Sequence, residues 1–399
     1  MNLANRLRQF IPQQNNAPTP TPQGVNLDLF LQGQEVITPF GACYVVQKAF
    51  PLEEKHGLWP IGNTLEVTSS SLRQLGQEPP NSFEMENALF LDTETTGLAG
   101  GTGTYAFLVG TGRFSPTHFV VKQFLMRDYN EELALLYLVN QELQETDTII
   151  SFNGKTFDLP LLQTRFVISR LGFPGAHHHY HLDLLHMSRR LWRQKLESCS
   201  LSSLETNILG VTRTNDIPGF EIPERYFQFL QSGQGELLQD IIQHNVIDIV
   251  SMATLLYRLG LTIGLSPEEC DCPWEAEALA QLALNAGDQQ LAVSYLEAAR
   301  QLCTELEQEI RLLHQSALIH KRLGLYQRAT TLWKRILELA EDDLMAYEEL
   351  AKFYEHRAKD LGAADQVTRR ALAVAWQTKS PKIPALEHRL QRIKRKALG

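Results

Sequence analysis

The sequence predicts an α/β domain with a mixed β-sheet flanked by helices, followed by an all-α domain of helical repeats. Three observations lead to this fold class. Between residues 81 and 266, short apolar runs that end in turn residues alternate with segments of helical spacing. Strand signals vanish beyond about residue 273. Alanines recur there at an almost constant interval, which is typical of stacked helix pairs.

The α/β region is expected to contain three consecutive strands, then a helix, a strand and a helix. Ala88–Leu91 is an apolar run of the kind found in buried strands. The order of the elements favours a mixed sheet over an all-parallel one. The expected strands are 88–91, 105–109, 119–124 and 148–152, and the expected helices are 131–143, 159–171 and 235–259.

The repeat region is defined by Ala292, Ala329 and Ala364, which are 37 and 35 residues apart. That interval is close to the roughly 34 residues of tetratricopeptide helix pairs. Small residues at such positions let two helices approach closely. The third copy is degenerate, as a terminal cap often is. An unrelated helical bundle is the alternative.

Length and local composition predict several segments. A chain of 399 residues exceeds a single typical core. Polar and proline-rich residues near the N-terminus predict a disordered linker, and basic residues dominate the C-terminal end. We expect a disordered segment at 1–26, a small β-containing lead-in at 27–80, the α/β domain at 81–266, the repeats at 273–378 and a basic tail at 379–399.

The composition is that of an ordinary soluble protein, with 43% hydrophobic and 21% charged residues. No apolar run approaches the roughly 20 residues of a membrane helix, so we expect a cytoplasmic protein without membrane attachment. The five cysteines are scattered, which favours free thiols over a zinc site. A net charge of −9 argues at first against a nucleic-acid partner, but bound cations would offset several carboxylates.

Four carboxylates stand among apolar residues, where an unpaired charge is expensive to bury. They are Asp92, Glu94, Asp158 and Asp248. Acids kept in such places usually hold a cation, and hard divalent ions such as Mg²⁺ or Mn²⁺ take oxygen ligands. The set therefore indicates metal-dependent phosphodiester chemistry.

Each of these acids also has a purely structural interpretation. Asp92 and Glu94 are two residues apart on a strand and share one face of the sheet, unless a strand-end turn points both to solvent. Asp158 precedes a helix, where an aspartate stabilises free backbone N–H groups. His244 lies four residues before Asp248 on one helical face. It would orient or deprotonate an attacking water, or both residues would belong to a polar stripe.

Together, the segments around the four acids resemble the three exonuclease motifs of the DEDD, or DnaQ-like, branch of the RNase H superfamily. The resemblance implies an RNase H-like fold that binds two divalent metals and removes nucleotides one at a time from a 3′ end of nucleic acid. The metal ligands would be Asp92, Glu94, Asp158 and Asp248, and His244 would be the general base. The family carries tyrosine four residues before the last acid, or histidine five before it. This chain has histidine at four and departs from both patterns.

Residues from roughly 35 to 375 are similar to a bacterial group of predicted exonucleases that carry this domain together with C-terminal tetratricopeptide repeats. The segments that carry this similarity are 98–104, 183–186, 198–201 and 216–219.

Several polar residues are candidates for contacts with nucleic acid: Thr95, Asn153, Arg189, Arg190 and Arg193. The first follows the first motif, and the second leaves the strand that precedes Asp158. The arginines form a basic helical stretch around a tryptophan, and such residues contact phosphates while an aromatic ring stacks on a base. A solvated helix face is the alternative for the arginines.

The leading hypothesis is a magnesium- or manganese-dependent 3′–5′ exonuclease that acts on nucleic acid by a two-metal mechanism, with repeats that recruit a protein partner. One alternative is a nucleic-acid-binding protein that keeps the fold but lacks efficient catalysis. Another is an interaction scaffold in which residues 273–375 do the main work. No sugar-reading element distinguishes DNA from RNA.

Overall fold

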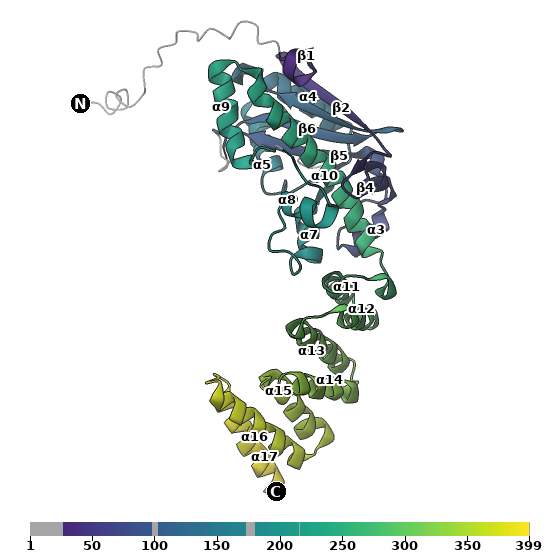
Figure 1. Ribbon diagram of the computed structural model, residues 1–399, viewed down its shortest axis with the longest axis vertical. Helices are drawn as coiled ribbons and strands as arrows, with labels where there is room; N and C mark the ends of the chain where they lie inside the picture. The colour runs from purple at the N-terminus through teal and green to yellow at the C-terminus, as the bar shows by residue number, and fades with distance from the viewer. Residues whose placement is uncertain (1–26, 98–102, 173–179, 215, 399) are drawn as a thin grey trace, which may run out of the picture. The chain divides into compact units, whose positions relative to one another are not determined.

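The computed structural model describes residues 27–97, 103–172, 180–214 and 216–398. The predicted disordered segment at 1–26 and most of the Gly-rich segment at 98–104 lie outside these residues. Within them the predicted fold class is confirmed, because a mixed seven-stranded sheet flanked by helices precedes an all-helical region (Figure 1).

The chain forms two compact units, and each draws on segments far apart in the sequence. The described residues of the sheet unit fall within 27–65, 83–183 and 209–254. The helical unit consists of Glu66–Ser82, Leu184–Ile208 and Leu255–Gly399.

The strands of the sheet follow the order β1-β2-β7-β6-β5-β8-β9. Neighbours are antiparallel from β1 to β5, whereas β5, β8 and β9 are parallel. A helix precedes β8 and another follows it, as parallel neighbours require. The bounds are β1 (Gly33–Thr38), β2 (Gly41–Pro51), β5 (Ala88–Thr95), β6 (Ala106–Phe114), β7 (His118–Leu125), β8 (Thr148–Ser151) and β9 (Tyr180–Asp183). A separate ribbon contains β3 (Lys55–His56) and β4 (Trp59–Pro60).

Helices of the sheet unit bury apolar side chains in one core with the sheet. Val139 of α4 and Phe166 of α5 are fully buried there, and the ring of Tyr226 of α9 stacks on Phe107 with 3.8 Å between centroids. The bounds are α2 (Asp28–Leu31), α4 (Glu132–Gln144), α5 (Asp158–Ile168), α9 (Ile222–Ser232) and α10 (Gln239–Ile263).

Helix α10 crosses the face of the sheet that carries Gly110 and Gly112 of β6 (Figure 1). A Cβ atom on Gly110 would lie 2.1 Å from Asn245 Oδ1, and one on Gly112 would lie 2.6 Å from Ile249 Cγ2. Gly110 pairs directly with Asp92 of β5, and residues directly opposite one another project from the same face. The two glycines therefore bring α10 close to the sheet beside Asp92.

Among the described residues, Gly235–Ile263 is the one helix that is long and apolar enough to cross a membrane by length and composition. Core helices of soluble proteins pass the same test. In this protein 67% of the apolar window is buried, so most of its apolar surface is used inside the protein.

The helical unit begins with α3 (Ser69–Gln74), α7 (Leu184–Trp192) and α8 (Leu201–Leu204). Seven consecutive helices follow: α11 (Pro273–Asn285), α12 (Gln289–Leu302), α13 (Leu306–Arg322), α14 (Tyr326–Leu339), α15 (Leu344–Phe353), α16 (Leu361–Gln377) and α17 (Ile383–Leu398). Ala292, Ala329 and Ala364 are fully buried, on α12, α14 and α16. Each lies on the second helix of a packed pair.

Short 3₁₀ and π turns complete the described elements. They are η1 (Ile61–Glu66), η2 (Met85–Asn87), η3 (Tyr129–Glu131), η4 (Glu205–Leu209), η5 (Gly219–Glu221), η6 (Gly235–Leu238), η7 (Pro267–Glu269) and η8 (Tyr354–Ala358). The five cysteines are all free thiols.

Candidate metal centre

Strand β5 places Asp92 and Glu94 on one face near the centre of the sheet. Its first four residues are buried and its last four are half-buried. The parallel neighbour β8 pairs with it only over Ala88–Phe90, so β5 extends beyond that neighbour before it ends. The two carboxylates therefore lie on the part of β5 that extends past the end of its pairing with β8.

Asp158 begins α5, directly after the loop that leaves β8. Its carboxylate is buried and accepts a hydrogen bond of 2.5 Å from the hydroxyl of Thr93, the residue between the two strand acids. Asp183 holds the loop by accepting bonds from the backbone N–H groups of Asn153 (3.0 Å) and Lys155 (3.2 Å). Asn153 has a left-handed backbone (φ 64°), which asparagine adopts more readily than most residues. These contacts fix Asp158 beside β5.

Helix α10 supplies Asn245 to the same place. Its side-chain N–H donates to Asp92 Oδ2 at 2.8 Å, and its carbonyl accepts a bond of 2.8 Å from Gln123 Nε2 of β7. Sequence reasoning missed Asn245, because an asparagine in a helix carries no pattern that identifies partners 153 and 122 residues away.

Burial and mutual repulsion disfavour the charged forms of the acids. For Asp92, burial is the largest cause that raises the pKa well above its usual value, followed by the charges of Asp248, Asp158 and Glu94. Burial, then Asp248 and Asp158, likewise raise the pKa of Glu94 well above its usual value. Burial raises the pKa of Asp158 to about 6, against the hydrogen bond that it accepts. A positive ion among these groups would therefore stabilise the cluster.

Glu94, His244 and Asp248 each offer one ligand atom, and these atoms lie within 4.8 Å of one another. His244 and Asp248 are one helical turn apart on α10, with 3.6 Å between His244 Nε2 and Asp248 Oδ2. Carboxylate oxygens suit Mg²⁺ and Mn²⁺, and an imidazole nitrogen suits several divalent metals. The donor set therefore fits a divalent ion, and the carboxylates of Asp92 and Asp158 stand next to it.

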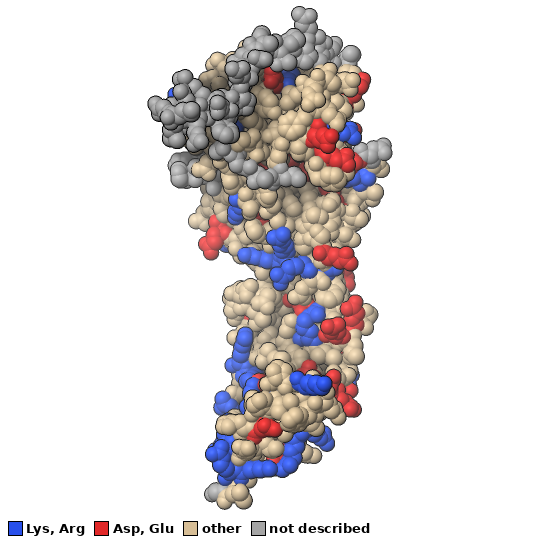
Figure 2. Space-filling model, turned by 90° about the vertical axis from the view of Figure 1, so that its left-hand side faces the viewer, with Lys and Arg blue, Asp and Glu red and all other residues tan. Residues whose placement is uncertain are grey.

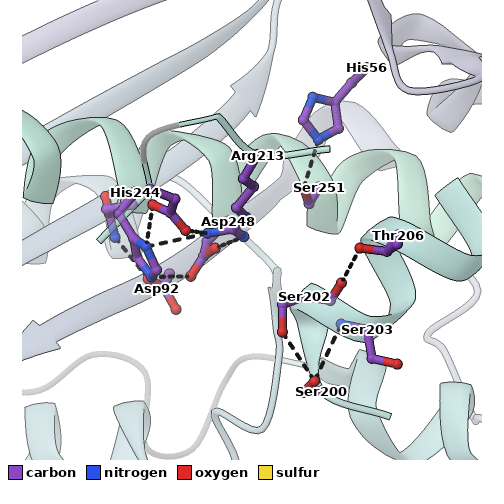
Figure 3. A network of polar contacts seen from close by, with 12 residues as sticks. His56, Asp92, Ser200, Ser202, Ser203, Thr206, Arg213, His244, Asp248 and Ser251 are labelled. Carbon is purple, nitrogen blue, oxygen red and sulfur yellow. Dashed lines mark hydrogen bonds and ion pairs between the residues drawn. The ribbon is translucent and has the colours of Figure 1, made fainter. Parts of the chain in front are cut away.

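A network of polar contacts surrounds His244 and Asp248 (Figure 3). Arg213 donates to Asp248 Oδ1 and forms an ion pair of 3.0 Å with Asp216. Asp216 Oδ1 lies 2.8 Å from His244 Nδ1. Arg213 Nη1 lies 3.3 Å from the same Nδ1, so Asp216 favours a proton on this nitrogen and Arg213 favours its absence, while Nε2 faces Asp248. Arg213 was not singled out from the sequence, because a loop arginine has no periodicity that reveals its partners.

A cavity of about 580 Å³ includes the acids of β5 and α5 in its wall. The candidate residues that line it are Asp92, Glu94, Thr95, Asn153 and Asp158. Phe157, which is 55% exposed, also lines it. Arg189, Arg190 and Arg193 belong to the helical unit, where they line a different cavity.

The comparisons with known proteins agree with this geometry. A model of the RNase_H superfamily matches residues 89–260, a span that contains all four acids and His244. The chain is also 32% identical over 363 residues to "Uncharacterized protein YprB" of Bacillus subtilis (strain 168). That match covers 89% of this chain and 86% of the relative. The chain belongs to the YprB family.

In this member of the YprB family, the candidate centre lies within an RNase H superfamily domain. Members of that superfamily are typically hydrolases that act on nucleic acids, and they generally use divalent metals. The superfamily that the sequence motifs resembled is therefore confirmed for residues 89–260.

Proposed function

We propose that the chain is a divalent-metal-dependent 3′–5′ exonuclease of the DEDD type. The observation that carries the proposal is the convergence of Asp92, Glu94, Asp158 and Asp248, which come from β5, α5 and α10. The raised pKa values of Asp92, Glu94 and Asp158 support the proposal, because a cation would favour the charged forms that burial and mutual repulsion disfavour.

Asp92, Glu94, Asp158 and Asp248 would hold two ions of Mg²⁺ or Mn²⁺. When bound, such ions supply an activated water and positive charge that offsets the charge of the scissile phosphate. Other residues of the chain orient the carboxylates that would hold these ions. Asn245 orients Asp92, and Thr93 orients Asp158, each through one hydrogen bond.

His244 would act as the general base. In the tautomer with its proton on Nδ1, which would donate to Asp216, Nε2 would accept a proton from the attacking water. The histidine is four residues before Asp248 rather than five, and the contact of 3.6 Å between the two side chains shows that this spacing still directs Nε2 toward the acids.

The cavity beside the acids would hold the 3′-terminal nucleotide of DNA or RNA. Thr95 and Asn153 line it and would contact the terminal sugar or phosphate. The exposed ring of Phe157 offers a surface on which the terminal base would stack.

Replacement of Asp92 by asparagine tests this proposal. Asp92→Asn keeps the shape and the bond from Asn245 to one oxygen, but it removes a negative ligand. We expect loss of Mg²⁺- or Mn²⁺-dependent nuclease activity by at least about 100-fold, with the circular dichroism spectrum unchanged. Oligonucleotides labelled at the 5′ or the 3′ end would report polarity, because a 3′–5′ exonuclease releases a 3′ label as a mononucleotide at once.

Asp147→Asn is the matched control, since Asp147 is an exposed aspartate of the sheet unit next to the first residue of β8. It should keep full activity. A fully active Asp92→Asn protein would end the assignment.

One observation favours the alternative of a nucleic-acid-binding protein with weak catalysis. The guanidinium of Arg213 pairs with Asp248, and a cation already held there competes with a metal ion. Calorimetric titration with Mn²⁺ separates the two functions. An exonuclease should bind the ion at micromolar to millimolar concentration, whereas a weakly catalytic protein would bind nucleic acid without it.

We also propose that α11–α17 form tetratricopeptide-like repeats that bind a protein partner. The support is the packing of consecutive helices in pairs, with Ala292, Ala329 and Ala364 buried at equivalent places. Small residues there allow the close helix approach that such repeats require.

A further inference from the structure

Helix α7 has a buried apolar face and an exposed basic face. The buried side chains include Leu184, Leu185, Met187, Leu191 and Trp192. The exposed side chains include Arg189 and Arg190, and Arg193 follows in the turn after the helix. Figure 2 has a group of Lys and Arg side chains at the level where Figure 1 draws α7 and α11.

Buried polar contacts fix the orientation of α7 on α11. Trp192 is fully buried, and its Nε1–H donates to Glu275 Oε1 at 2.9 Å. The buried carboxylate of Glu275 also pairs with Arg258 at 2.9 Å and with Lys195 at 3.4 Å. Because the buried face of α7 is anchored, its exposed basic face has a fixed direction within the helical unit.

Arg190 is held still more closely. Its guanidinium donates to the backbone carbonyl of Leu75, at the end of α3. The next residue, Gly76, has a left-handed backbone (φ 71°), and a Cβ atom on it would lie 2.6 Å from Arg190 Nη1. Glycine adopts this backbone conformation without strain and leaves room for the guanidinium.

These arginines line a cavity of about 630 Å³ between α3, α7 and α11. Arg73, Arg189, Arg190 and Arg193 are its basic residues, and Glu277 is its acidic residue. Glu277 is buried and already satisfied, because Arg311 pairs with both of its oxygens at 2.9 Å and Gln315 donates to it at 2.8 Å.

The cavity therefore carries an excess of positive charge. Within the part of the chain that the structure describes, no acidic side chain pairs with Arg189, Arg190 or Arg193. A solvated helix face would explain exposed arginines on α7 alone, but here exposed arginines of α3, of α7 and of the turn after it line one cavity.

An aromatic ring completes the wall. Trp274 of α11 is half-buried and lines the cavity, and the guanidinium of Arg311 lies over its ring, 5.1 Å from the centroid. Guanidinium groups bind phosphate oxygens in a two-pronged manner, and indole rings stack on bases. Phosphates and bases occur together in nucleic acid, which favours it over an acidic peptide.

We propose that this cavity is a second nucleic-acid site, which binds a single-stranded segment through its phosphates and one stacked base. The proposal rests on the proposed function only for the class of ligand. A volume of about 630 Å³ is in the range of sites that enclose one or two nucleotides.

The test is equilibrium binding by the full-length protein in EDTA, where metal-dependent cleavage does not occur. Fluorescence anisotropy of labelled oligo-dT and oligo-U, each 20 nucleotides long, is measured at several salt concentrations. Arg189→Ala/Arg193→Ala should weaken binding at least tenfold at low salt. It should also reduce the slope of log affinity against log salt by about 1.4, since each phosphate contact to a single strand contributes about 0.7.

Trp274→Leu should weaken binding at least threefold without changing the salt slope, because stacking releases no counterions. The matched control is Arg369→Ala/Arg370→Ala, which removes the same charge from exposed positions of α16. It should bind within twofold of the unmodified protein. Circular dichroism checks that each variant is folded.

Two results would overturn the proposal: unchanged binding by Arg189→Ala/Arg193→Ala, or an equal loss in the α16 control, which would indicate diffuse attraction. The outcome does not depend on the proposed exonuclease. If Asp92→Asn stays fully active but the cavity variants lose binding, the exonuclease assignment fails and the second site stands. If the cavity variants bind normally while Asp92→Asn is inactive, only the second site fails.

Discussion

Gly110 and Asn245 set the distance and the contact between α10 and the sheet. The absence of a side chain at Gly110 leaves room for Asn245 Oδ1, which would otherwise lie 2.1 Å from a Cβ atom. Because that oxygen accepts from Gln123, the amide N–H of Asn245 is directed at Asp92. The carboxylate of Asp92 is thus oriented by Asn245, whose own position depends on Gln123 of β7 and Gly110 of β6.

Gly110→Ala should destabilise the protein by about 1–3 kcal/mol, because the added methyl group forces α10 away from β6. Urea or guanidinium unfolding measures the change. Gly172→Ala is the control, since a Cβ atom there meets nothing within 4 Å, and it should stay within about 0.5 kcal/mol. Equal stabilities of the two variants would show that α10 does not need the close approach.

Asn245→Ala should weaken Mn²⁺ binding by about 10–100-fold, the usual effect of removing a residue that orients a metal ligand. The loss of its donor also raises the pKa of Asp92 further, so the acid binds a proton more readily in competition with the metal. Isothermal titration calorimetry measures the affinity. Asn285→Ala, at an exposed asparagine of the helical unit, should leave it unchanged. An unaltered Mn²⁺ affinity in a folded Asn245→Ala protein would contradict the role of Asn245.

Among the elements, α17 is tied to the end of α15 by one buried acid. Helix α15 continues into the π turn η8, which contains Glu355. The carboxylate of Glu355 accepts bonds from Arg389 (2.8 Å), Arg392 (2.7 Å) and Lys396 (2.9 Å) of α17. Part of the positive charge of residues 379–399 is therefore neutralised within the helical unit, and is used to hold the last helix in place.

The bonds to Glu355 predict a pH dependence of stability. The hydrogen bond from Arg392, the largest cause, and then Lys396 lower the pKa of Glu355 to about 2. Since this folded-state pKa is below the unfolded value of about 4.3, the stabilisation is fully present above that value. It is lost as the pH falls from there through about 2.

Glu355→Gln should therefore destabilise the protein by about 2 kcal/mol at pH 7. The difference from the unmodified protein should shrink between pH 4.5 and pH 2.5. Urea unfolding at several pH values provides the measurement, and Glu387→Gln, at an exposed position of α17, serves as the control. A constant difference across this range would mean that the charge of Glu355 contributes nothing.

On the scale of the whole molecule, local patterns predicted the central elements. The predicted strands at 88–91 and 119–124 lie within β5 and β7, and the one at 148–152 overlaps β8. The run at 88–91 is buried throughout, and a strand buried on both faces is continuously apolar. The membership of β1 and β2 in the same sheet was not predicted. β2 pairs with β7, and a partner more than sixty residues away leaves no trace in local periodicity.

The same distinction holds at the candidate centre. The four acids were predicted as a set, because charged residues among apolar neighbours are visible in the sequence. No role was assigned from the sequence to Asn245, Arg213 or Asp216. Each of them binds a partner that is distant in the sequence and comes near only in the fold. Residues that orient metal ligands or a general base through hydrogen bonds are thus the part of a site that cannot be identified from a single sequence.

The acids also predict how the whole molecule responds to metal. A ligand that binds only the folded state stabilises it, by about 2.7 kcal/mol when its concentration is 100 times the dissociation constant. Mn²⁺ should therefore raise the unfolding temperature of the unmodified protein, and EDTA should reverse the increase. Asp92→Asn should be more stable than the unmodified protein without metal, because it relieves repulsion among buried acids, and should gain little from Mn²⁺. Sodium chloride at equal ionic strength controls for screening. An equal increase in both proteins would mean that Mn²⁺ binds elsewhere.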